Sequence, residues 1–308
     1  MSAASILDPR NALLTVLAVV ALLYLTLVVR ATMRGTKEGD RAAPTPLGFA
    51  TGFVTNFFDT LGIGSFATTT AIFRRFGMVR DEKIPGTLNV GHTLPTIVQA
   101  FIFTKLVPVD PKTLILLIVA AELGAWVGAG VVAKWPRRRI QLGMGVALLI
   151  FAGFLIMTLA SRNPTGGTLL ELTGTKLIVG FAGNLALGAL MTLGIGLYAP
   201  CMIMIYMLGM NPTAAFPIMM GSCAFLMPMA SIRFVRTRSY DLKAILGMML
   251  GGIPAVLIAA FIVKTMDIDY VRVLVIIVVT YTGIGMLRSA RRERDIATQA
   301  TAAEAAPA

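Results

Sequence analysis

The chain has few of the residues on which catalytic and metal sites are usually built. Its 308 residues include two cysteines and a single histidine. The sequence shows no cluster with metal-ligand spacing, no phosphate-binding loop and no nucleophile beside an evident base. We therefore expect neither an enzyme nor a bound metal or cofactor. Cys201 and Cys223 lie within apolar runs, which favours buried thiols over a disulfide framework.

Charge is also scarce. Only 14% of the residues are charged, against about 25% in a typical soluble domain, while 56% are hydrophobic and the mean hydropathy is +0.81. A net charge of +12 would suggest nucleic acid as the partner of a soluble protein. Here the Lys and Arg residues lie between apolar runs, where they fix orientation in a membrane. The sequence predicts an integral membrane protein whose partner is the lipid bilayer, not nucleic acid.

Apolar runs long enough to cross a bilayer, roughly 17 to 25 residues, recur along the chain. The first run ends at Arg30 without a small-residue cleavage site, so we interpret it as a retained span. Two longer stretches, 47–76 and 176–208, are each interrupted by the letters Leu-Gly-Ile-Gly. The remaining pattern predicts seven ordinary crossings, at 11–29, 85–104, 113–133, 140–160, 213–232, 244–263 and 271–287.

Basic residues indicate how these segments run, because cytoplasmic loops retain Lys and Arg. Five clusters of four basic residues occur, within 30–41, 74–83, 134–139, 233–243 and 288–294. A single crossing by 47–76 would place its two flanking clusters on opposite faces. We therefore predict that 47–76 is a re-entrant hairpin open to the cytoplasm and that 176–208 is one open to the outside. The N-terminus is then outside and the C-terminus cytoplasmic.

The two interrupted stretches belong to an internal repeat. A shift of 132 residues superimposes Leu61–Gly64 on Leu193–Gly196, Gly77-Met78 on Gly209-Met210, and Pro85 on Pro217. Each unit is a hairpin followed by three crossings, and because three is odd the second unit is inverted. The predicted fold is an all-α integral membrane protein built as an inverted repeat of two units, each a re-entrant broken-helix hairpin plus three transmembrane helices, preceded by one N-terminal transmembrane helix.

This fold divides the chain into five segments. The expected boundaries are 1–46 for the N-terminal transmembrane helix and its cytoplasmic linker, 47–160 for the first repeat, 161–174 for an external linker, 175–288 for the second repeat, and 289–308 for a disordered cytoplasmic tail. Inverted repeats with broken helices are typical of secondary transporters, in which two halves alternately expose a site near the membrane midplane.

The hairpin turns are candidate anion sites. A helix begins near Gly64 and another near Gly196, and the start of a helix combines unpaired N–H groups with about half a positive charge. Glycine lets these donors approach a ligand closely. Polar residues gather nearby, although Ser and Thr often bond only to their own helix. The predicted substrate-binding residues are Asn56, Thr60, Gly62, Gly64, Ser65, Thr68, Asn89, Thr192, Gly194, Gly196, Tyr198 and Ser222.

Three ionisable residues are expected at membrane depth: Asp59, His92 and Glu122. Intramembrane charge is costly and commonly marks ion or proton pathways. The shift of 132 places Met191, Ala224 and Pro254 opposite them, so we predict a coupling or gating role and not symmetric anion binding. The alternative is structural: a lone histidine that is simply hydrogen-bonded, and a protonated Glu122 bonded to a neighbouring helix.

The hairpins resemble those of the sulfite exporter TauE/SafE family, whose hallmark is a duplicated glycine-rich element followed by a Pro-containing helix. The matching text is residues 59–65 and 192–200, and the likeness extends over 47–287. Ser65 and Leu197 replace a glycine that is usual in the family, and Pro200 of the second copy has Thr68 opposite it in the first. The two replaced glycines are where we look for substrate specificity.

The resemblance implies transport of a small anion, such as sulfite, a sulfonate like sulfoacetate, or thiosulfate, across a bacterial inner membrane. A proton-coupled carboxylate transporter is the alternative. Thiosulfate handling through the Cys201 thiol, a membrane-embedded enzyme and an accessory subunit are the other hypotheses considered. No oligomeric state follows from the sequence.

Overall fold

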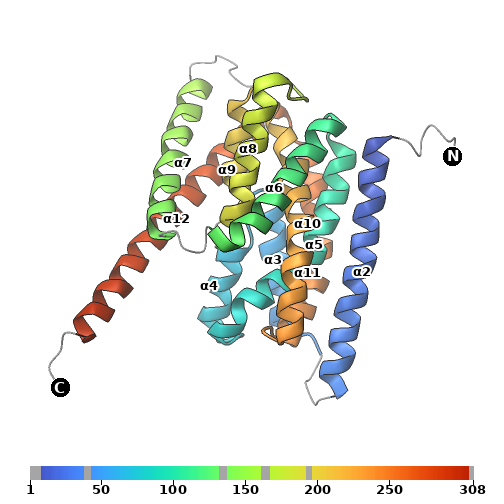
Figure 1. The fold of residues 1–308 in the computed structure, drawn as a ribbon, viewed down its shortest axis with the longest axis vertical. Coiled ribbons are helices and arrows are strands. Elements are labelled where there is room, and N and C mark those ends of the chain that lie inside the picture. The colour runs from blue at the N-terminus through green and yellow to red at the C-terminus, as the bar shows by residue number, and fades with distance from the viewer. Residues whose placement is uncertain (1–7, 38–42, 132–136, 161–166, 192–195, 305–308) are drawn as a thin grey trace.

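The computed structural model describes residues 8–37, 43–131, 137–160, 167–191 and 196–304. Within these ranges the regular elements are helices, so the prediction of an all-α protein is confirmed (Figure 1). In chain order they are α2 (Pro9–Lys37), α3 (Pro46–Thr60), α4 (Phe66–Phe76), the short 3-10 helix η1 (Asp81–Lys83), α5 (Ile84–Leu106), α6 (Pro111–Val131), α7 (Arg137–Ala160), α8 (Gly174–Met191), α9 (Tyr198–Met207), the 3-10 helix η3 (Pro212–Ala214), α10 (Ala215–Thr237), α11 (Leu242–Thr265) and α12 (Ile268–Glu304).

Six stretches of the described chain are long and apolar enough to cross a membrane: Pro9–Arg34, Arg138–Met157, Gly174–Met191, Pro212–Thr237, Leu242–Thr265 and Asp269–Arg294. Five of them coincide with predicted crossings, which confirms a multi-pass membrane protein. The sixth is α8, which the sequence predicts as half of a hairpin. Helix α5 covers the predicted crossing at 85–104, and α6 covers the described part, 113–131, of the crossing predicted at 113–133.

Both long stretches are broken where the glycines predict a break. Helix α3 ends at Thr60 and α4 begins at Phe66. Between them Gly62 and Gly64 have φ angles of 97° and 84°, in the left-handed region that an L side chain adopts only with strain. Helix α8 ends at Met191 and α9 begins at Tyr198. The turn in the first stretch therefore depends on glycine at two positions.

The order of elements is the same in the two halves: a helix, a break, a short helix, a 3-10 turn and three long helices. The short helices also end alike. Gly77 and Gly209, 132 residues apart, both have positive φ angles, of 58° and 84°. The next N–H group then bonds back, Met78 to the carbonyl of Phe73 at 3.0 Å and Met210 to that of Ile205 at 3.2 Å. The local structure thus repeats at the spacing found in the sequence.

Helices pack across the two halves in a reciprocal pattern. Helix α3 packs on α11 and α8 packs on α6, while α5 pairs with α10 and α7 with α12. Glycines bring the backbones together: a Cβ atom at Gly52 would lie 2.4 Å from the Cα atom of Met248, and one at Gly188 would lie 2.0 Å from the carbonyl oxygen of Ala121. The first helix of each broken stretch therefore rests on a helix of the other half.

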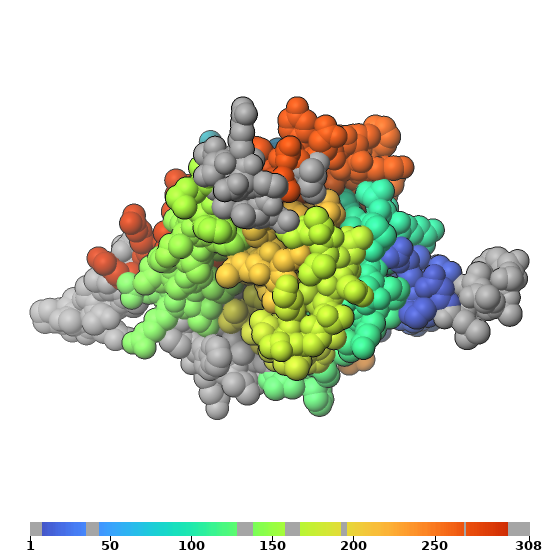
Figure 2. Space-filling model, turned by 90° about the horizontal axis from the view of Figure 1, so that it is seen from above, coloured from blue at the N-terminus to red at the C-terminus, as the bar shows by residue number. Residues whose placement is uncertain are grey.

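Hydrogen bonds between the connecting segments show which helix ends lie together at each end of the molecule. The N–H group of Asn211, after α9, bonds to the carbonyl of Leu169, before α8, at 2.8 Å, so α8 begins where α9 ends. Arg10 at the start of α2 bonds to the carbonyl of Val109, between α5 and α6, at 2.7 Å. The α8 start is seen from above in Figure 2.

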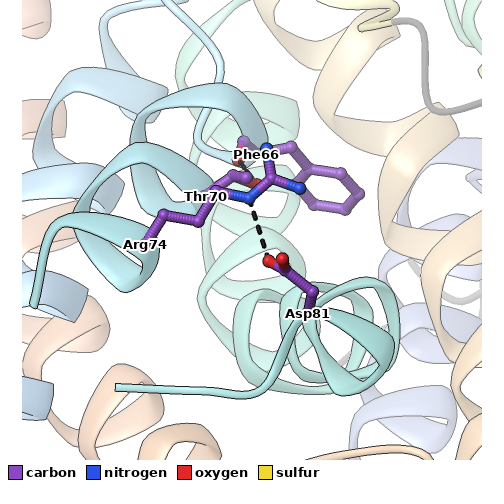
Figure 3. A network of polar contacts seen from close by, with 4 residues as sticks. All are labelled: Phe66, Thr70, Arg74 and Asp81. Atoms are coloured by element: carbon purple, nitrogen blue, oxygen red, sulfur yellow. Dashed lines mark hydrogen bonds and ion pairs between the residues drawn. The ribbon is translucent and has the colours of Figure 1, made fainter. Parts of the chain in front are cut away.

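At the other end, α3 begins where α4 ends, since the Thr51 hydroxyl lies 3.8 Å from the Met78 sulfur. Arg74 on α4 forms an ion pair with Asp81 of η1 at 3.0 Å (Figure 3). The Thr70 hydroxyl, one turn earlier, bonds to the carbonyl of Phe66 in its own helix. The start of α2 and the end of α12 lie toward opposite ends of the molecule in Figure 1.

Helix α12 differs from expectation at its end. It continues past residue 288, where the sequence predicts the start of a disordered tail, and ends at Glu304. The residues from 288 onward are mostly Arg, Ala and Glu, which have high helix propensity, so a helix can continue without an apolar face.

Candidate functional site

The candidate site lies around the turn between α3 and α4, which we call the first tip (residues 61–65), and around the described residues directly before α9, which we call the second tip (residues 196 and 197). The first tip lies close to α9, because a Cβ atom at Gly62 would lie 3.2 Å from the sulfur of Met202 on that helix. Thr192 and Gly194, both predicted to bind substrate, lie outside the described residues; Gly196 and Leu197 are described.

His92 lies at the centre of a buried network in the first half. Its Nδ1 atom is 3.0 Å from Oδ1 of Asn56 on α3, and its Nε2 atom is 2.9 Å from the hydroxyl of Thr69 on α4. The Asn56 amide nitrogen donates to the carbonyl of Gly52, which turns Oδ1 toward the imidazole. Nδ1 therefore donates to Asn56 and Nε2 accepts from Thr69. Phe66 stacks on the ring, with 5.9 Å between centroids.

A second network joins the two tips. The side-chain nitrogen of Gln99, on α5, donates to Oδ2 of Asp59 at 3.0 Å and to the hydroxyl oxygen of Thr60 at 2.9 Å. Its Oε1 atom accepts from the hydroxyl of Tyr198 at 3.2 Å. Ser65 also interacts with the Asp59 carboxyl group through its hydroxyl and its N–H. Four predicted residues, Asp59, Thr60, Ser65 and Tyr198, are thus brought together around Gln99.

Most of these side-chain donors already have acceptors inside the protein. The Thr60 hydroxyl donates to the carbonyl of Asn56, and the Thr68 hydroxyl bonds to that of Ser65. Asn89 donates to the carbonyl of Pro85 in its own helix and has no described contact with either tip. An anion at the tips therefore has to be bound mainly by backbone N–H groups.

The starts of α4 and α9 offer such donors. Neither helix has a side-chain cap: Ser65 and Leu197 occupy the N-cap positions without capping hydrogen bonds. Within the described residues no acceptor contacts the first N–H groups of either helix, at Phe66 and Tyr198. Among the described residues free space adjoins both, because a Cβ atom at Gly64 or at Gly196 would meet none of their atoms within 4 Å. Two uncapped helix starts beside open space can hold a small anion.

Ser222 belongs to a different cluster. The amide nitrogen of Asn184, on α8, donates to the carbonyl of Leu117 at 2.6 Å and to the Ser222 hydroxyl at 3.0 Å. Asn184 is fully buried, and its Oδ1 atom has no partner among the described residues. This cluster in the second half parallels the Asn56–His92 pair in the first, since each joins the helix before a tip to the helix that follows the hairpin.

Glu122 and the cysteines lie beside this second cluster. The Oε1 atom of Glu122 is buried and has no partner in the described part of the chain. Both thiols are free and buried, and the Cys223 sulfur lies 3.7 Å from that of Met191. Among the described residues no group of three or more His, Cys, Asp or Glu side chains could hold a metal ion.

Gln99 and Asn184 were not among the site residues predicted from the sequence. Each is an uncharged amide inside an apolar run, at 0% exposure in the structure. A polar side chain within a membrane span needs a partner, and that signal could have singled out both residues. Their partners lie up to 99 residues away, and only the packing of the helices shows them.

Comparison of the sequence with known proteins shows to which family the chain belongs. No curated protein and no solved structure matches the chain significantly. The family model described as "Sulfite exporter TauE/SafE" matches residues 2–155 and 171–308, nearly the whole chain. This confirms the resemblance carried by the glycine hairpins. The chain therefore belongs to the sulfite exporter TauE/SafE family of membrane transporters.

Proposed function

We propose that this protein is a secondary transporter that moves a small sulfur-containing anion, such as sulfite, a sulfonate like sulfoacetate, or thiosulfate, across the inner membrane. The observation that carries the proposal is the pair of uncapped helix starts at Phe66 and Tyr198, each beside a glycine next to open space. Such donors stabilise negative charge without a basic side chain. The anion is held between the two tips.

Alternating access follows from the repeat. The two halves have the same order of elements, their short helices end alike 132 residues apart, and α3 and α8 pack reciprocally on α11 and α6. These features support an inverted repeat in which each broken stretch is a re-entrant hairpin. Movement of one half against the other then exposes the tips to one side of the membrane at a time.

The test is uptake of radiolabelled anions into proteoliposomes. Sulfite, sulfoacetate, thiosulfate and small carboxylates are compared, with protein-free vesicles as the control. Saturable uptake of at least one sulfur anion, inhibited by the unlabelled form, is expected. If none of the four classes enters faster than in protein-free vesicles, the proposal is wrong.

A carboxylate transporter is the second candidate, because backbone N–H groups donate to a carboxylate as readily as to a sulfur oxyanion. The same panel separates the two candidates: carboxylate uptake that sulfite and sulfoacetate do not inhibit favours the second.

Thiosulfate handling through a thiol is tested by replacing Cys201 and Cys223 with serine. The burial of both thiols leads us to expect unchanged transport.

A further inference from the structure

One amide side chain connects the two tips. Gln99 is fully buried in α5. It contacts Asp59 and Thr60, the last two residues of α3, and also Tyr198, the first residue of α9. The end of the helix before the first tip and the start of the helix after the second tip are therefore bonded to the same side chain.

The orientation of the amide follows from its neighbours. The Thr60 hydroxyl donates its proton to the carbonyl of Asn56 at 2.7 Å, so it can only accept from Gln99. The Gln99 nitrogen must then face α3, where it also reaches Asp59. Its oxygen faces α9 and accepts from Tyr198. Both amide protons and the amide oxygen are thus used, and a residue of another shape or polarity cannot make all three bonds.

Asp59 depends on this amide. No Lys, Arg or His side chain pairs with it in the described part of the chain, where the ion pairs involve exposed residues such as Asp81, Glu82 and Asp269. Its carboxyl group is 3% exposed and is held by Gln99, with Ser65 nearby. A buried carboxyl group without a cation needs hydrogen-bond donors, and Gln99, Ser65 and Tyr198 supply them.

We propose that Gln99 is a positioning residue that fixes the spacing of the two tips and thereby sets the affinity of the transporter for its anion. The part of this inference that concerns transport rests on the proposed function. Gln99 itself does not bind the anion, because its donors and its acceptor are already occupied. Its effect is exerted through Asp59, in the helix that leads to the first tip, and through Tyr198, in the helix that follows the second tip.

A reciprocal exchange of polar groups tests this role. Gln99→Glu replaces the donor facing Asp59 with a second carboxyl group, so the KM for the transported anion should rise at least about tenfold, the cost of losing a hydrogen bond to a charged group. The double variant Asp59→Asn with Gln99→Glu exchanges donor and acceptor and keeps one carboxyl group at the site. The exchange restores the contact with residue 59 but not the donor to the Thr60 oxygen, so its KM should lie between that of Gln99→Glu and that of wild type.

Gln141→Ala is the matched control. Gln141 is the other buried glutamine among the described residues, and it lies on α7 without a contact to either tip. The KM of the Gln141→Ala variant should equal that of wild type. A double variant no better than Gln99→Glu alone would contradict the positioning role.

Amide hydrogen exchange of the full-length protein in detergent micelles tests the connection without transport. In Gln99→Ala, peptides covering 57–66 and 196–202 should both exchange about fivefold faster than in wild type, while peptides of α7 stay unchanged. Faster exchange at neither tip, or at one alone, would overturn the proposal. If wild-type protein transports no anion but exchange behaves as expected, the proposed function fails and the connection between the tips stands.

Discussion

His92 joins three helices of the first half through the two nitrogens of its ring. It lies on α5, donates to Asn56 on α3 and accepts from Thr69 on α4. These bonds are satisfied within the protein, which supports the structural alternative for this residue; a coupling or gating role of Asp59 and Glu122 stays a prediction. The contacts with both helices that flank the first tip make His92 a determinant of how that tip is held.

His92→Ala should therefore lower stability. The change leaves the buried Oδ1 atom of Asn56 without a donor, which costs about 1–3 kcal/mol. Asn89→Ala is the control on the same helix, because Asn89 bonds only to its own backbone. The unfolding midpoint of both variants is measured in detergent micelles. Equal midpoints would show that the His92 bonds contribute nothing to the fold.

Glu122→Gln should weaken the response of transport to a pH gradient. The carboxyl group lies on α6 with one buried oxygen that has no described partner, and the amide keeps its shape while removing the proton-binding group. Uptake into proteoliposomes is compared with and without an inward proton gradient. Glu82→Gln, at an exposed ion pair with Arg80, is the control. A wild-type response in Glu122→Gln would exclude Glu122 from coupling.

At the scale of elements, two helix crossings depend on glycine. A Cβ atom at Gly52 would lie 2.4 Å from the backbone of Met248, whereas one at Gly143, on α7, would meet nothing within 4 Å. Small residues at such crossings let membrane helices approach closely. The crossings of α3 with α11 and of α8 with α6 hold the helices that lead to the two tips.

Gly52→Val should destabilise the protein by about 1–3 kcal/mol through overpacking at the crossing. Gly143→Val has the same change in volume and should be neutral. The yield of monodisperse protein and its unfolding midpoint are the measurements. Equal behaviour of the two variants would mean that α3 and α11 are not in close contact.

Which elements form could be predicted, but not how they pair. Apolar runs located the crossings, and the glycines located both breaks, because hydropathy and backbone freedom are local properties. The length of α8 did not separate a half-crossing from a full one, since 18 residues of helix span about 27 Å. The helical extension of α12 was missed because it has no apolar periodicity to mark it.

At the scale of the whole molecule, topology follows from charge. The basic residues at 74–83 and 233–243 lie at one end, where α5 and α11 begin, since the N–H of Asp241 bonds to the Thr87 hydroxyl at 2.9 Å. Arg10 and the start of α2 lie at the other end, with the α5–α6 connection. From the positive-inside rule we predict that the first end is cytoplasmic.

Thiol labelling tests this orientation. In intact cells a membrane-impermeant maleimide should label Asp8→Cys and should not label Arg291→Cys; both positions are exposed, and the native thiols are buried. Labelling of Arg291→Cys alone would show that the orientation is the reverse of the predicted one.

The pairing of the two tips could not be predicted from the sequence, because it arises from contacts such as Gln99 to Tyr198 between distant segments.

The most direct test of an anion held between two tips is the KM of Gly196→Ala. A Cβ atom at Gly196 meets no atom of the described residues within 4 Å, so the variant should fold normally while its methyl group occupies the space beside the α9 donors. We predict a KM for the transported anion at least about tenfold above that of wild type and of Gly143→Ala. An unchanged KM in a folded Gly196→Ala protein would place the anion elsewhere.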